Sequence, residues 1–220
     1  MSKPIQGSAY DVGFWSAALC ALFSLIYVAA QLAEWLGWLG SAGGPHSRST
    51  SAGLVVLLTP SLLLGVAFVA LTVSIHYIAE PARRVWSHIA IALASMYATL
   101  TGLVYYVQLA FVMPRLARGE IDGIRLLIFE PFDSFLYAVD VFAYGLMSLA
   151  TLFAAQAFRG AGREQRRIFW ALTANGCLLP FLWLQMYYPP LIWGGALWAI
   201  TFPAASVLLA QYFRRPSVVT

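Results

Sequence analysis

The sequence predicts an all-α polytopic integral membrane protein, a bundle of six transmembrane helices with its N and C termini in the cytoplasm. The first observation behind this is composition: of 220 residues, 61% are hydrophobic and 10% are charged, and the mean hydropathy is +0.76. Soluble domains are about 45–50% apolar and about 25% charged, and disordered chains are apolar-poor. Both of those classes are therefore excluded. The other two observations are the lengths of the apolar stretches and the placement of the basic residues.

Six apolar stretches are long enough to cross a bilayer, which takes about 20 mostly apolar residues in a helix. The predicted spans are 12–38, 53–79, 88–113, 132–158, 168–188 and 191–213. The strands of a membrane barrel would alternate in hydropathy over about ten residues, whereas these stretches are continuous and much longer. No long polar segment separates the spans, so we expect residues 1–220 to form a single transmembrane domain.

The first three spans each carry a feature that bears on their assignment. The first is too long for a signal peptide, includes Glu34 and lacks a small-residue cleavage site, so we interpret it as a retained helix. The second contains Pro60, which is expected to kink its helix, and is followed by a loop with Pro81. The third has small residues at successive i,i+4 positions, which predicts a face for close helix packing, namely Ala94, Ala98 and Gly102.

The last three spans are also marked by their sequences. Asp133 stands at the start of the fourth, where a carboxylate suits the helix dipole. Pro180 in the fifth and Pro203 in the sixth are expected to kink their helices, and a proline pair, 189–190, predicts a tight hairpin between them. The two cysteines, Cys20 and Cys177, lie within spans without a CxxC motif, which argues against thiol–disulfide chemistry.

The basic residues predict the orientation, because cytoplasmic loops carry the excess of Lys and Arg. Nine lie on the side of the termini: Lys3, Arg83, Arg84, Arg159, Arg163, Arg166, Arg167, Arg214 and Arg215. Four lie opposite: Arg48, Arg115, Arg118 and Arg125. We therefore expect a multi-pass protein of the inner (cytoplasmic) membrane. The lipid bilayer is the expected partner of the basic loops, and nucleic acid is not.

The two loops predicted on the outer side differ in character. Residues 40–52 are rich in Gly and Ser, which indicates a flexible segment with little chemistry. Residues 114–131 mix arginines and acids with large apolar side chains. That mixture suits either a surface connector or a lid over an outer cavity.

Two carboxylates are predicted to lie within spans, Glu34 and Asp140. Ionisable groups at such positions are costly and are functional candidates. Asp140 would lie about 12 Å below the outer boundary, at about 1.5 Å per residue. On the first span a polar stripe at helical spacing comprises Ser16, Cys20, Ser24, Tyr27, Gln31 and Glu34. On the fourth, the equivalent stripe comprises Ser134, Tyr137, Asp140, Tyr144, Ser148 and Thr151.

Several spans thus place polar groups at a similar depth, which allows two interpretations. One is a buried network that only holds the helices together. The other is an outward-facing, aromatic-lined pocket for a small organic cation, a proton or an amphipathic ligand. Aromatic faces attract cations, and a carboxyl group removed from water can exchange a proton. The candidate ligand-binding residues are Asp140, Glu34, Gln31, Gln108, Gln185, Tyr105, Tyr137, Tyr144 and Trp198.

A metal site is not expected. His76 and Glu80 are one helical turn apart and His88 begins the next span, but no fourth ligand stands out. No phosphate-binding, dinucleotide or hydrolase motif occurs in a suitable context, and the single lysine, Lys3, lies outside the spans, which excludes a retinal Schiff base. We therefore predict no cofactor.

The leading hypothesis is a binding or transport protein for a small cationic or amphipathic ligand, with proton coupling through Asp140. One alternative is an intramembrane enzyme acting on a lipid or isoprenoid-like substrate. In it, either Asp140 and Glu34 would serve as acid and base, or His76, Glu80 and His88 would hold a metal. Another is a non-catalytic membrane subunit or assembly factor whose polar stripes are packing surfaces. The sequence identifies no catalytic residue and leaves the ligand and the oligomeric state open.

Overall fold

The computed structural model describes residues 3–214, with side chains from residue 7 onward, and this part of the chain is helical without any strand. Six helices are long and apolar enough to cross a membrane: Gly7–Trp35, Ser51–Ile78, Pro81–Ala117, Phe135–Phe158, Arg163–Leu184 and Pro189–Arg214. The all-helical fold and the presence of six helices long and apolar enough to span a membrane are therefore confirmed. Arg215 and the side chain of Lys3, both used to predict the orientation, lie outside what the structure describes.

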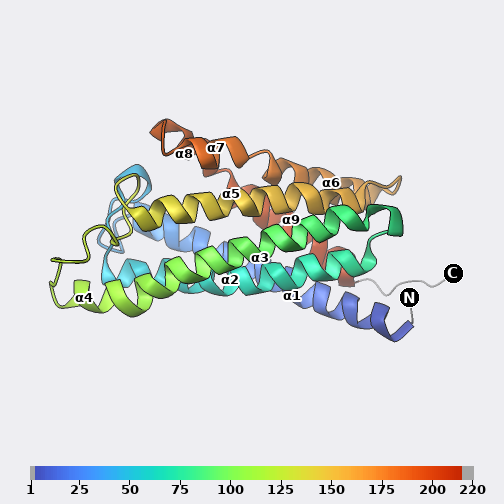
Figure 1. Cartoon of the computed structure of the whole chain (residues 1–220), viewed down its shortest axis with the longest axis horizontal. Coiled ribbons are helices and arrows are strands. Elements are labelled where there is room, and N and C mark those ends of the chain that lie inside the picture. The colour runs from blue at the N-terminus through green and yellow to red at the C-terminus, as the bar shows by residue number, and fades with distance from the viewer. Residues whose placement is uncertain (1–2, 215–220) are drawn as a thin grey trace.

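The helices follow one another around a closed ring (Figure 1). α1 (Lys3–Trp35) packs against α2 (Ser51–Ile78), and α2 packs against α3 (Arg84–Val107). α3 packs against α5 (Phe135–Ala155), which is followed by α6 (Arg163–Gly176) and α9 (Trp198–Arg214). α9 closes the ring against α1.

The start of α1 and the end of α9 lie at one end of the bundle (Figure 1). We call the opposite end the distal end. It holds three connections, 36–50, 118–134 and 185–191, which lie at the left of the view. An even number of antiparallel helices requires this arrangement.

Three spans depart from a simple helix. The third continues from α3 through a π-helical turn (Gln108–Val112) into α4 (Met113–Ala117). The fifth is interrupted between α6 and α7 (Leu179–Leu184), and the sixth between α8 (Ile192–Gly195) and α9. Hydropathy predicts six continuous helices and does not predict these interruptions, because it depends on apolar content and not on the continuity of the backbone.

The prolines act differently from one another. Pro180 stands in the first turn of α7, where the missing N–H leaves no hydrogen bond unmade, so the helix restarts there. Pro60 and Pro203 instead lie inside the continuous helices α2 and α9. Of the three prolines expected to kink their helices, only Pro180 coincides with a break, whereas the pair 189–190 lies at the expected turn between the fifth and sixth spans.

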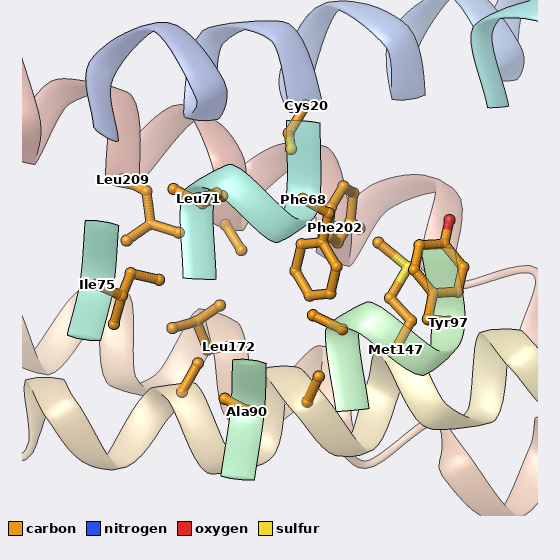
Figure 2. Close-up of a cluster of buried hydrophobic side chains, with 14 of the residues drawn as sticks. Cys20, Phe68, Leu71, Ile75, Ala90, Tyr97, Met147, Leu172, Phe202 and Leu209 are labelled. Atoms are coloured by element: carbon orange, nitrogen blue, oxygen red, sulfur yellow. The ribbon is translucent and has the colours of Figure 1, made fainter. Parts of the chain in front are cut away.

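The main hydrophobic core lies between the helices, inside the bundle (Figure 2). Every span contributes to it. The labelled side chains are Cys20 from α1, Phe68, Leu71 and Ile75 from α2, Ala90 and Tyr97 from α3, Met147 from α5, Leu172 from α6, and Phe202 and Leu209 from α9. The ring of Phe68 meets those of Tyr97 and Phe202 edge-on, with centroids 5.8 and 5.7 Å apart.

Small residues allow close helix crossings at two places. A Cβ on Gly65 would lie 3.3 Å from the Cα of Ala98, between α2 and α3, and one on Gly176 would lie 2.7 Å from the Cβ of Leu152, between α6 and α5. Ala94 is fully buried. The predicted packing face of the third span is wrong only for Gly102, because a Cβ there would meet nothing within 4 Å.

A buried polar network joins three spans below the distal end. The Thr201 hydroxyl donates to the side-chain carbonyl of Asn175 at 2.8 Å, and the Asn175 amide donates to the Thr151 hydroxyl at 3.2 Å. Asn175 and Thr151 are fully buried. Because these groups satisfy one another, we assign them to holding α5, α6 and α9 together.

The connection 118–134 folds over the helix ends at the distal end. Its Ile124 and Ile128 are buried against Val104 and Val112 in a second core cluster. The Gln108 side-chain amide donates to the carbonyl of Leu127. The segment is thus packed onto the bundle. Of the two interpretations of its sequence, this packing favours a cover over the helix ends and not a surface connector.

Candidate functional site

A cavity of about 320 Å³ lies at the distal end, lined by residues of all six spans and of the three distal connections. Its floor and walls come from the ends of the helices, and its cover comes from the connections 36–50 and 118–134. This volume is at the lower end of the range for small-molecule sites, about 300–1,000 Å³. The cavity can therefore hold one small organic molecule.

Eight of the nine candidate residues named from the sequence line this cavity. They are Gln31, Glu34, Tyr105, Tyr137, Asp140, Tyr144, Gln185 and Trp198. The ninth, Gln108, is fully buried outside the lining, where its amide holds the 118–134 connection. The structure thus brings together groups from α1, α3, α5, α9 and the segment after α7.

Asp140 reaches the cavity from the second turn of α5. Ser134 caps this helix by accepting from the backbone N–H of Tyr137, and the helix begins at Phe135, so Asp140 is carried into the bundle. Its side chain is 7% exposed, and Oδ1 has no hydrogen-bond partner among the described residues. The Tyr105 hydroxyl interacts with this carboxyl group. A buried acceptor without a partner is unfavourable by about 1–3 kcal/mol, so a donor from a ligand would be favoured here.

Glu34 reaches the same cavity from the last turn of α1. It is 2% exposed. Its Oε1 accepts from the hydroxyl of Ser47 at 2.6 Å, while Oε2 has no partner in the described part of the chain. The cavity therefore contains a second carboxyl group with one oxygen available.

Aromatic rings surround these carboxyl groups. Trp198 packs edge-on against Tyr144 and Tyr27, with ring centroids 5.4 and 5.9 Å from its own. The Tyr105 hydroxyl donates to that of Tyr144 at 3.2 Å. Trp198 is 5% exposed, and its indole N–H finds no acceptor within the described residues. Such a wall offers ring faces to a cation and one N–H to an acceptor.

Two glutamines satisfy tyrosine hydroxyls in the lining. Gln185 accepts from the Tyr137 hydroxyl at 3.0 Å and donates to the Leu182 carbonyl, and Gln31 donates to the Tyr27 hydroxyl at 3.1 Å. The rings of Phe129 and Phe132, in the 118–134 connection, pack edge-on against Tyr137. These contacts fix the orientation of Tyr27 and Tyr137 before any ligand is present.

The rest of the lining is apolar and reaches the surface of the molecule. Leu54, Leu57, Leu58, Val141, Leu182 and Ile192 are among the apolar lining residues. Leu32 and Trp35 of α1 line the cavity and are 51% and 48% exposed on the side of the bundle. Arg48, also exposed, lies at the cover. Residues of the lining are thus exposed both on the apolar flank of α1 and at the distal end.

Sequence reasoning missed the contribution of the cover. The 36–50 connection supplies Ser47 to Glu34, and its Ser49 hydroxyl donates to the carbonyl of Phe129 at 2.6 Å, which joins the two connections. Composition predicted little chemistry for this Gly- and Ser-rich segment. A serine that pairs with a buried carboxyl carries no signal in one sequence, because the contact depends on how the loop folds back.

The residues considered for a metal are only partly brought together. The rings of His76 and His88 lie 4.0 Å apart between centroids, and His76 Nδ1 is 2.8 Å from the Ser87 hydroxyl. Glu80 instead faces Arg83 at 3.5 Å. Among the described residues, no three His, Cys, Asp or Glu side chains are grouped so that they could hold a metal ion.

Comparison with known protein families, with curated proteins and with solved structures found no significant match. The candidate function therefore depends on the cavity itself.

Proposed function

We propose that this protein is a multi-pass integral membrane protein that binds a small cationic or amphipathic ligand in the distal cavity, and that it transports this ligand. One observation carries the proposal: two buried carboxyl groups, Asp140 and Glu34, each have an oxygen without a partner in the described structure, in one aromatic-lined cavity. A cation would gain the attraction of both carboxylates and of the surrounding rings. In a network that served only to join helices, such groups would satisfy each other, as Asn175 and its partners do.

The proposed orientation places both termini in the cytoplasm and the cavity on the outer side. It is supported by the larger number of arginines at the end of the bundle that holds the termini, including Arg163, Arg166 and Arg167. The proposed location is the inner, or cytoplasmic, membrane. A ligand would then reach the cavity from the outer aqueous phase or from the outer leaflet.

Proton coupling is the mechanism we propose for transport. The Asp140 carboxyl group would hold either a proton or the cationic ligand, because only its ionised form attracts a cation. Ligand binding would then release a proton. We therefore expect the affinity of the wild-type protein for a cation to decrease as the pH falls.

The test is ligand-induced stabilisation of the purified protein in detergent. The panel comprises protonated amines, such as phenethylamine, and quaternary ammonium ions, with phenethyl alcohol as the neutral reference. A ligand at about one hundred times its Kd adds about 2.7 kcal/mol to the free energy of unfolding, which corresponds to a rise in Tm of roughly 5–10 °C. We expect such a rise for cations and not for the alcohol.

Asp140→Asn should abolish this rise. The matched control is Asp133→Asn, the same chemical change seven residues earlier, at an exposed position outside the cavity. The control should respond as the wild type does. Equal responses of Asp140→Asn and the wild type, or no cation response in the wild type, would refute the proposal.

A further inference from the structure

We infer that the ligand is a protonated amine with N–H donors and a neighbouring oxygen acceptor, attached to an apolar body. The inference rests on the proposed function and deepens it by naming the class of ligand. Three unpartnered polar atoms carry it: Asp140 Oδ1, Glu34 Oε2 and Trp198 Nε1. All three belong to side chains that are more than nine-tenths buried and line the cavity.

The two carboxyl oxygens require donors. An ionised carboxylate only accepts hydrogen bonds, and Ser47 already occupies the other oxygen of Glu34. A protonated primary amine brings three N–H donors and one positive charge, so one headgroup can bond to a carboxylate and also contact ring faces. A quaternary ammonium ion brings the charge without N–H donors, and it would leave both buried acceptors unsatisfied. The cavity should therefore discriminate between the two.

The indole nitrogen requires an acceptor. Trp198 can only donate at Nε1, and it is held in place by its stack on Phe202, with parallel rings 5.2 Å apart. Its edge contacts with Tyr27 and Tyr144 place it beside the polar part of the lining. A hydroxyl, ether or carbonyl oxygen close to the amine would accept from this N–H. An amine with an adjacent oxygen thus matches the free donors and acceptors of the cavity.

The remainder of the ligand should be apolar. The apolar lining side chains, such as Leu54, Leu58 and Val141, offer no further hydrogen bond. Leu32 and Trp35 extend the lining to the apolar flank of the bundle. An aromatic or short aliphatic body would replace water along this surface.

The test compares three matched probes by titration calorimetry on the full chain in detergent: phenethylamine, its N,N,N-trimethyl derivative and phenylethanolamine. The first two share charge and body and differ in N–H donors. We expect the trimethyl derivative to bind about tenfold or more weakly, since a hydrogen bond to a charged group contributes about 1.5–3 kcal/mol. Phenylethanolamine adds a hydroxyl next to the amine and should bind several-fold more tightly than phenethylamine.

Trp198→Phe tests the acceptor separately. This variant keeps an aromatic ring and removes the N–H, so the advantage of phenylethanolamine over phenethylamine should disappear. Trp170→Phe is the matched control, because Trp170 is exposed on α6 and is outside the cavity lining. Trp170→Phe should show the same ratio of affinities for phenylethanolamine and phenethylamine as the wild type. The affinity of the wild type for phenylethanolamine relative to phenethylamine tests the role of the Trp198 N–H even where Trp198→Phe does not fold.

The outcomes separate this inference from the proposed function. Equal or tighter binding of the trimethyl derivative would overturn the inference and leave the proposed cation site standing. No preference for phenylethanolamine in the wild type would overturn the assignment of Trp198. Binding of none of the three probes would overturn the inference, and the absence of any response to the wider cation panel would overturn the proposed function as well.

Discussion

At the scale of single residues, the cavity depends on how each buried polar atom is satisfied. Glu34 is paired through one oxygen with Ser47 of the neighbouring connection, whereas Asp140 lies among tyrosines. Ser16 and Ser24, in the same stripe as Glu34, donate to carbonyl groups of their own helix. The stripe predicted on α1 therefore has two parts. Its serines are satisfied locally, and its end at Tyr27, Gln31 and Glu34 lines the cavity.

The pairing of Ser47 with Glu34 yields a prediction about stability. Ser47→Ala removes the partner of a buried carboxyl group, so the free energy of unfolding should fall by about 1–3 kcal/mol. In a double-mutant cycle with Glu34→Gln, thermal unfolding should show a coupling energy of at least about 0.5 kcal/mol. As a control, the effects of Ser47→Ala and Glu120→Gln on the free energy of unfolding should be additive, because Glu120 is in an exposed ion pair with Arg118. Additivity of Ser47 with Glu34 would mean that the contact contributes nothing.

At the scale of elements, close helix crossings and interrupted helices shape the distal end. α6 approaches α5 at Gly176, one residue before the interruption that leads to α7. The interruption between α8 and α9 supplies Ala196 and is followed by Trp198, and both line the cavity. Non-helical backbone inside a membrane protein is tolerated where it is buried or lines a cavity. The discontinuity between α8 and α9 thus lies in the lining of the cavity.

The crossing at Gly176 yields a prediction with an internal control. In Gly176→Ala the new methyl group would lie 2.7 Å from the Cβ of Leu152 and 3.1 Å from the carbonyl oxygen of Ser148. Relief requires movement of the helix backbone, so we expect a loss of about 1–3 kcal/mol. Gly102→Ala, also within a helix, meets nothing within 4 Å and should be neutral or mildly stabilising. Thermal unfolding of the two variants in detergent decides this, and equal losses would contradict the assigned crossing.

At the scale of the whole molecule, the ring of helices closes around an apolar core at one end and a polar, aromatic cavity at the other. The core side chains of Figure 2 fill the axis of the bundle from Ile75 to Tyr97. Tyr97 then meets Tyr144, whose ring contacts Trp198 of the cavity, with centroids 5.5 and 5.4 Å apart. The rigid core thus supports the floor of the site.

The proposed orientation is tested by labelling single cysteines with a membrane-impermeant maleimide in intact cells. The background replaces Cys20 and Cys177 with alanine. Asp122→Cys is at an exposed position of the 118–134 connection at the distal end, and Ala161→Cys is at an exposed position between α5 and α6, at the opposite end. We expect the first to be labelled in intact cells, and the second only after lysis. The reverse pattern would place the cavity on the cytoplasmic side.

The sequence by itself determined the class of fold, the number of apolar helices long enough to span a membrane, and eight of the residues that line the cavity. Apolar content and helical periodicity are local properties. A stripe such as Tyr137, Asp140 and Ser148 identifies the buried face of its helix without knowledge of its neighbours. The tertiary structure alone decided that Glu34 and Asp140 share one cavity, that Ser47 and Phe129 complete it, and that Gln108 holds a connection instead. These outcomes depend on helix rotation, on the breaks in the fifth and sixth spans and on the path of the loops. Contacts between residues far apart in the chain set all three, and one sequence does not record such contacts.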